Sequence, residues 1–185
     1  MNLAFITGIL GSLILVVGAA CPEPKNKVHP TKSLKNWLLA IGGIIMFIYA
    51  LLNFQQGGQI FFVILEILVV IASIMMMLDT KDTIDSIIIA LSGIGLLIWS
   101  LILFEDHSTV IFILGLTGVG LGYVFKMATL RRIIALTLGS TLIAIFSLIE
   151  ANWIYFWLNT FFAIFSAFYL IKIIFAKNLP GTSDF

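Results

Sequence analysis

The chain has 185 residues, of which 61% are apolar and 10% are charged, and its mean hydropathy is +1.17. Soluble domains are about half apolar and about a quarter charged, so this composition excludes a soluble globular protein and indicates an integral membrane protein. Ten Lys and Arg residues against nine Asp and Glu give a net charge of +1, which leaves no basic excess for a nucleic-acid partner. One cysteine, Cys21, and two histidines, His29 and His107, are too few for a disulfide within the chain or for an iron–sulfur, haem or zinc site. We therefore expect no cofactor and no metal.

The apolar residues fall into seven runs, each close to the roughly 17 to 25 residues that cross the hydrocarbon core of a bilayer. All four prolines lie outside the runs, as uninterrupted helices require. The longest segment between runs is 21–36, so nothing is left over for a soluble domain. The predicted spans are 3–20, 37–52, 59–78, 83–104, 109–125, 133–149 and 152–175. The sequence thus predicts an all-α integral membrane protein with seven transmembrane helices.

The cations give the expected orientation, because Lys and Arg concentrate in cytoplasmic loops. With the amino terminus outside, the inner segments are 21–36, 79–82, 126–132 and the tail from Lys172, and these hold all ten cations. We therefore expect the N-terminus outside and the C-terminus inside. The ionisable residues of the outer loops are then Glu105, Asp106, His107 and Glu150.

The first run leaves an alternative open. Residues 13–20 followed by Cys21 resemble a signal peptide or a lipoprotein cleavage site, but no cationic segment precedes them, and Gly18 stands where a lipobox has Leu. Cleavage would also leave the lysines of segment 21–36 outside. We expect an uncleaved first helix.

The second and third runs are similar to the sixth and seventh. Gly42 and Gly139 lie near the inner ends of the second and sixth runs, and an aromatic residue follows each after seven positions. The third and seventh runs then begin on an amide and carry one strongly polar residue seven positions further in, Glu66 or Asn159. Seven helical residues descend about 10 Å, most of the way to the midplane of the membrane.

The first and fifth runs match more loosely, with Gly8 and Gly11 aligned to Gly115 and Gly118. The chain is therefore expected to contain two three-helix bundles joined by a linker helix. Because four spans separate the halves, both enter the membrane from the same side and the repeat is parallel. The expected parts are 1–78 for the first bundle, 83–104 for the linker, 109–175 for the second bundle and 176–185 for a cytoplasmic tail.

Two short segments carry a resemblance to a known family. Pro22-Glu23 with the downstream segment 31–33, and segment 150–159 with its tight turn and Asn159, resemble motifs of the SWEET and SemiSWEET sugar transporters and related PQ-loop proteins. The 3+1+3 arrangement resembles the same family and, more distantly, the transporters for nicotinamide riboside. The resemblance implies a central pocket lined by a polar pair on the third helix of each repeat, here Glu66 and Asn159. The sequence departs from the family at Glu23 and Glu66, at Tyr123-Val124-Phe125 where a second Pro-Gln would fall, and in its lack of hinge prolines within the helices.

Glu66 has no other charged residue within 12 positions on either side. A carboxylate at that depth costs about 2.5 kcal/mol or more, so the side chain is either protonated or faces a wet cavity or a partner. As a functional residue it would bind solute or couple transport to protons. As a structural residue it would hydrogen-bond a neighbouring helix or another subunit.

Asn159 can donate and accept hydrogen bonds, as a polar solute requires, although hydrogen bonding between helices uses the same capacity. Trp153, Tyr155 and Trp157 lie at the outer end of the last run, where an interfacial aromatic belt is expected. We place Trp157, which lies deeper than Trp153, in the site as a stacking surface for a ring-bearing solute. The expected substrate-binding residues are Glu66, Asn159 and Trp157.

Two functions remain. The sequence has no nucleophile–base set, phosphate loop or carboxylate dyad, so we expect no enzyme. The first function is a transporter, specifically a facilitator, of a small polar solute such as a sugar or vitamin-like compound, with the solute and the lipid bilayer as partners. The second is a structural or assembly subunit of a larger membrane complex or homo-oligomer, in which Glu66 and the glycines would serve subunit packing. We expect the protein in a bacterial inner membrane or in an organellar membrane of bacterial origin.

Overall fold

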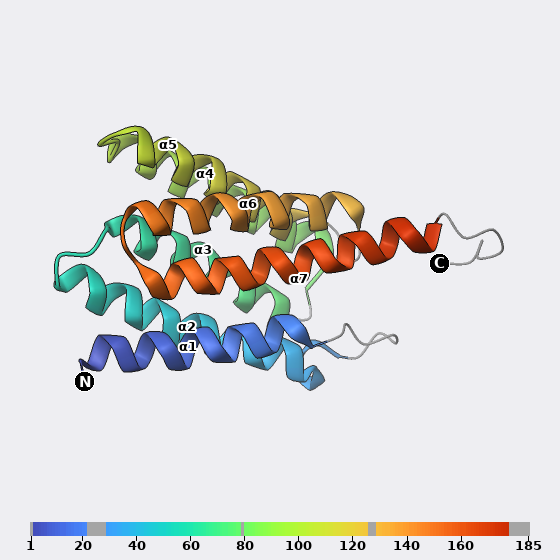
Figure 1. Cartoon of the computed structure of the whole chain (residues 1–185). Helices are drawn as coiled ribbons and strands as arrows, with labels where there is room; N and C mark the ends of the chain where they lie inside the picture. The colour runs from blue at the N-terminus through green and yellow to red at the C-terminus, as the bar shows by residue number, and fades with distance from the viewer. Residues whose placement is uncertain (1, 22–28, 79, 126–128, 178–185) are drawn as a thin grey trace.

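The computed structural model describes residues 2–21, 29–78, 80–125 and 129–177, which form seven α-helices and a short 3₁₀ helix (Figure 1). Each α-helix is long and apolar enough to cross a membrane, which confirms the prediction of a seven-span, all-helical protein. Pro22-Glu23 lies outside the described residues, as do Lys25, Lys27 and Lys126. The helices are α1 (Leu3–Ala20), η1 (Pro30–Lys32), α2 (Leu34–Gln55), α3 (Ile60–Met77), α4 (Asp82–Ile102), α5 (His107–Val124), α6 (Leu130–Ile149) and α7 (Trp153–Lys177).

Polar caps extend two helices beyond their apolar runs. The Ser33 hydroxyl accepts a hydrogen bond from the backbone N–H of Asn36, so α2 begins three residues earlier than predicted. Thr129 caps α6 in the same way, through the backbone N–H of Arg132. Both helices therefore begin with a polar turn, which brings Lys35 and Arg132 into regular helix.

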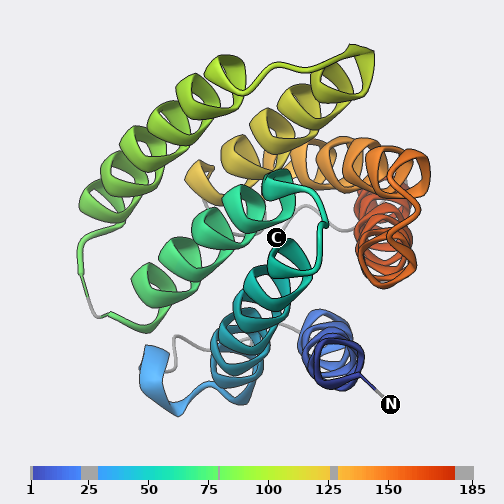
Figure 2. The same cartoon turned by 90° about the vertical axis from the view of Figure 1, so that its left-hand side faces the viewer.

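The helices are arranged in a ring that follows their order in the sequence (Figure 2). Every helix packs on its neighbours in the chain, and α1 closes the ring by packing on α7. The helix α4 packs on both α3 and α5, which also touch each other. Among the described helices, α1 does not contact α3, and α5 does not contact α7. Each group of three helices is therefore an arc of the ring.

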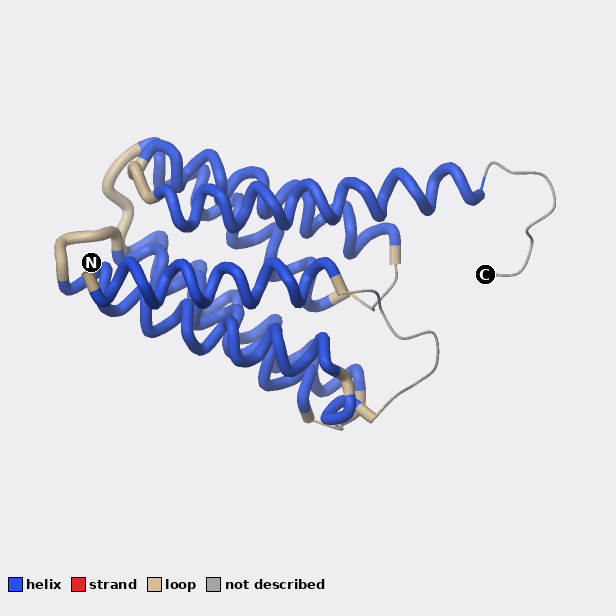
Figure 3. Tube along the Cα trace, turned by 60° about the horizontal axis from the view of Figure 1, so that its bottom comes forward, coloured by secondary structure: helices blue, strands red, loops and turns tan. Residues whose placement is uncertain are grey.

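The two ends of the ring differ in charge. The helices α1, α3, α5 and α7 begin at one end, which carries Glu105, Asp106 and Glu150 and, within the described residues, no Lys or Arg (Figure 3). We call this the acidic end. Every described Lys and Arg lies at or near the opposite end, which we call the basic end.

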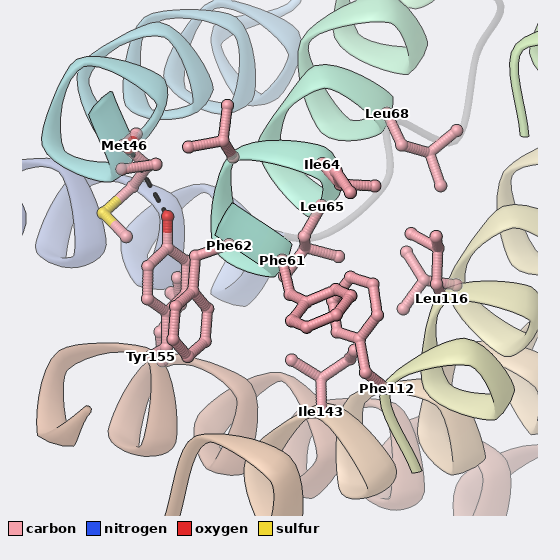
Figure 4. Close-up of a cluster of buried hydrophobic side chains, with 14 of the residues drawn as sticks. Met46, Phe61, Phe62, Ile64, Leu65, Leu68, Phe112, Leu116, Ile143 and Tyr155 are labelled. Carbon is pink, nitrogen blue, oxygen red and sulfur yellow. Dashed lines mark hydrogen bonds between the residues drawn. The ribbon is translucent and has the colours of Figure 1, made fainter. Parts of the chain in front are cut away.

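Aromatic side chains fill the ring toward the acidic end (Figure 4). Phe62 and Tyr155 stack with their ring centroids 4.3 Å apart and their planes 8° apart. Tyr155 is 0% exposed and therefore lies inside the ring, not in an interfacial belt. We call the following set the aromatic plug: Tyr49, Phe61, Phe62, Phe112, Phe146 and Tyr155.

Glycines allow α1 to pack closely on α2, and α5 on α6. At several glycines of these interfaces an added Cβ would meet an atom of the facing helix at 3.0 Å or less. Small residues at such contacts let helix backbones approach in lipid. The contacts are Gly11 with Met46, Gly42 with Leu15, Gly115 with Ile143, and Gly139 with Val119.

Candidate functional site

A cavity of about 260 Å³ lies inside the ring, on the basic side of the aromatic plug. Six helices line it, and α4 contributes no residue. Along α3 the lining runs from Leu65 and Glu66 to Met76, a distance of about 15 Å at 1.5 Å per residue. Lys35 and Arg132, from the first turns of α2 and α6, line its other end. The cavity therefore extends from the middle of the helices toward the basic end.

Glu66 lies at the plug end of this cavity and is 2% exposed. Its carboxyl group is beside the Tyr155 hydroxyl. Among the described residues, no donor reaches its Oε2 atom. A buried polar atom without a partner costs about 1–3 kcal/mol, so this site favours a hydrogen-bond donor or a proton that arrives through the cavity.

Asn159 lines the same cavity from α7 and is 8% exposed. Its Nδ2 atom donates a hydrogen bond to the Tyr155 carbonyl oxygen, 2.9 Å away. This bond orients the amide and uses one of its two N–H groups, which leaves the other N–H and Oδ1 for a ligand. The two polar residues that the sequence paired thus line one cavity from opposite arcs of the ring.

Trp157 lies away from the cavity. It is 53% exposed and is not among the lining residues. Successive helical residues turn by about 100°, so positions 157 and 159 point in nearly opposite directions. Near the start of α7, Tyr155, four positions before Asn159, is an aromatic residue that faces inward. We leave Trp157 out of the candidate site.

Several polar lining residues were missed in the sequence. Ser73 follows Glu66 by seven positions and Ser166 follows Asn159 by seven. Seven residues are close to two helical turns, so this spacing was the available signal that the serines share a face with the polar pair. The remaining missed polar lining residues are Lys35, Tyr123, Arg132, Ser140 and Tyr169.

Hydrogen bonds between the two arcs close the acidic end. The Tyr49 hydroxyl on α2 donates to Asn152 Oδ1, 3.1 Å away, at the start of α7. The Gln59 side-chain amide, before α3, donates to Glu150 Oε2 at 3.0 Å, after α6. We call these two bonds the acidic-end latch. The Ser108 hydroxyl lies 2.9 Å from Glu150 Oε1 and 2.6 Å from Asp106 Oδ1, so the two carboxylates share its single proton.

The described residues contain no group of three or more His, Cys, Asp or Glu side chains that could hold a metal ion. Comparisons with protein-family models, with curated proteins and with solved structures find no match to this chain. The cavity and the side chains that line it are therefore the features of this chain that point to a function.

Proposed function

We propose that this protein is a membrane transporter that carries a small polar solute, such as a sugar or a vitamin-like compound, through the cavity between the two arcs of the ring. The observation that carries the proposal is the unpartnered Glu66 oxygen, which is buried in a cavity within apolar helices. Asn159 on the opposite arc supplies donors and an acceptor for the same solute. A solid core between the arcs would instead have favoured the assembly subunit.

Repeated positions in the cavity lining support a parallel duplication. All five lining residues of α3 have a lining partner on α7 that lies 93 positions later in the chain. Glu66 pairs with Asn159 and Ser73 with Ser166 by this spacing. The other pairs are Leu65 with Leu158, Val69 with Phe162, and Met76 with Tyr169.

The remaining helices support the same duplication. Lys35 and Leu39 of α2 line the cavity, as do Arg132 and Leu136 of α6, 97 positions later. The glycine contacts change one detail of the expected alignment. Gly11 packs on Met46 as Gly115 packs on Ile143, so Gly11 corresponds to Gly115, a shift of 104 positions between α1 and α5. The 3+1+3 organisation supports the proposed likeness to SWEET-type transporters.

We infer a transport cycle of alternating access from the two ends of the cavity. In the present conformation the lining extends to the basic end, while the aromatic plug and the acidic-end latch close the other side. Access from the acidic end requires both latch bonds to break and Phe62 to separate from Tyr155. The cations indicate that the N-terminus is outside and the C-terminus inside. The present conformation then opens toward the bacterial cytoplasm or, in an organelle of bacterial origin, toward its inner compartment.

The proposal is tested by access and uptake. With Cys21→Ser as background, an uncharged hydrophilic maleimide should label Ser166→Cys in the cavity, whereas the lipid-facing control Leu138→Cys, 59% exposed, should react poorly. Proteoliposomes are then screened for uptake with a panel of labelled sugars and nucleosides. Asn159→Ala should abolish uptake of the active compound, and the lipid-facing control Ile164→Ala should retain it.

Failure of both measurements would refute the transporter. A protein whose Ser166→Cys does not react and which moves no compound of the panel would instead fit the assembly subunit. Glu66→Leu separates the two functions further. In a transporter this variant folds but is inactive, whereas a structural Glu66 predicts a loss of about 1–2 kcal/mol of packing in Glu66→Leu and none in Glu66→Gln.

A further inference from the structure

The two arcs differ in polarity at three related positions around Glu66. Glu66 corresponds to Asn159, Tyr155 to Phe62, and Tyr49 to Phe146, by the same shifts that relate the rest of the lining. The ring contacts are nevertheless alike, because Tyr49 lies 5.5 Å from Tyr155 and Phe146 lies 5.4 Å from Phe62 between centroids. The shape of the plug is therefore shared by the two arcs. The two hydroxyls, however, meet at only one of the two equivalent ring contacts, that of Tyr49 with Tyr155, and Glu66 lies beside Tyr155.

This difference shows what the acid adds to the site. A glutamate and an asparagine both offer oxygen acceptors, but only the carboxyl group can bind and release a proton, changing between the neutral acid and the carboxylate. The amide of Asn159 meets the need for a polar group in the equivalent place. The acid at position 66 is therefore not required for solute hydrogen bonding alone.

We propose that Glu66 is a proton-binding site and that its proton exchanges against the solute during transport. The exchange rests on the proposed function, whereas proton binding can be tested on the protein alone. In the empty carrier a proton from cavity water binds to Oε2 and converts the carboxylate to the neutral acid. When solute enters, that proton returns to the cavity water and a solute N–H or O–H donates to Oε2 in its place, so one proton and one solute donor compete for one oxygen.

The groups that face Glu66 fit this role. Tyr155 of α7 lies beside the carboxyl group, and Tyr123 of α5 lines the same cavity. Tyr49 of α2 lies behind Tyr155. The cations that line the cavity, Lys35 and Arg132, belong to the first turns of their helices at the other end, and the acids of α4 lie in its first turn at the basic end. The described part of α1 contains no ionisable side chain. Glu66 therefore has hydroxyl neighbours and no ion-pair partner on the helices around it.

The coupling is tested by the pH dependence of cavity access. In the Cys21→Ser background, the labelling rate of Ser73→Cys by an uncharged hydrophilic maleimide is measured at each pH. This rate is divided by the labelling rate of Thr31→Cys, an exposed position at the basic end. The division corrects for the effect of pH on thiol ionisation. Protonation removes the charge from the interior and favours the change toward the acidic-open state, so this ratio should fall on acidification. We expect a change of about fivefold or more, the lower end of coupling between linked sites.

Two variants identify the group that binds the proton. Glu66→Gln should make the ratio independent of pH, whereas Glu105→Gln, which removes an exposed carboxyl group at the acidic end, should leave the pH dependence intact. Difference infrared spectra should show a titrating carboxylic-acid C=O band that Glu66→Gln removes. Exchanging the two residues in Glu66→Asn with Asn159→Glu should restore such a band.

The outcomes separate this inference from the proposed function. If Ser73→Cys reacts but the ratio is flat with pH, or if Glu66→Gln keeps both the pH dependence and the infrared band, the proton site is refuted and the cavity stands. If Ser73→Cys does not react at any pH, the water-accessible cavity itself is refuted.

Discussion

The close contact between α5 and α6 makes a quantitative prediction for Gly139→Ala. A Cβ at this position would lie 2.5 Å from the backbone N of Val119, 2.8 Å from the carbonyl carbon of Gly118 and 3.0 Å from the carbonyl oxygen of Gly115. All three atoms belong to the backbone, so no change of rotamer relieves the overlap. Restoring ordinary contact requires the two helices to separate by about 1 Å, and overpacking of this kind costs about 1–3 kcal/mol.

Gly95→Ala is the matched control. This glycine of α4 has no heavy atom within 4 Å of an added Cβ, so alanine there gains helix propensity without a clash. The two variants are compared by their apparent melting temperatures in detergent, followed by tryptophan fluorescence. For a loss of about 2 kcal/mol, a chain of this length should melt roughly 4–8 °C lower. A Gly139→Ala protein that melts as high as Gly95→Ala would refute the close approach of the two backbones.

Three further predictions concern the ends of the ring. Glu150→Ala removes one latch bond and the support from α5, so labelling of Ser73→Cys from the basic end should fall relative to wild type; equal labelling would exclude the latch. Hydrogen bonds at the start of α5 lower the pKa of Asp106. The stabilisation by Asp106 is thus fully present above the pKa that an Asp has in the unfolded state, about 3.9. It is lost as the pH falls through the lower pKa of Asp106 in the folded state. The melting temperatures of wild type and Asp106→Ala should therefore converge as the pH falls, and a difference that stays constant with pH would contradict this. Finally, an impermeant thiol reagent should reach His107→Cys and Lys172→Cys from opposite sides of the membrane, and same-side labelling would overturn the topology.

The seven spans could be predicted because apolar runs of this length have few alternatives to a transmembrane helix. The starts of α2 and α6 could not be read from hydropathy, since caps at Ser33 and Thr129 extend both helices across polar residues. The same extension places Lys35 and Arg132 in the cavity lining. In the sequence these two cations were interpreted only as a sign of orientation.

Which side of each helix faces inward was harder to predict, because lipid and protein interior are both apolar. Ile64 of α3 is 0% exposed, while Trp157, its counterpart 93 positions later, is 53% exposed. Hydropathy does not distinguish two such residues. Polar residues do, because they avoid lipid, and this is why Glu66 and Asn159 were found while the inward position of Tyr155 was not.

The order of helices around the ring has a consequence for biosynthesis. Each helix from α2 to α6 can pack on the one before it as soon as it enters the bilayer, since neighbours in the ring are neighbours in the chain. The pairing of α1 with α7 is different, because it brings Gly8 against Ile154, 146 positions later. Contacts so distant in sequence form slowly and only after the intervening chain is made. A nascent chain that ends before α7 therefore retains every earlier helix pair. One wall of its cavity, with Asn159, is missing, and Glu66 has no Tyr155 beside it.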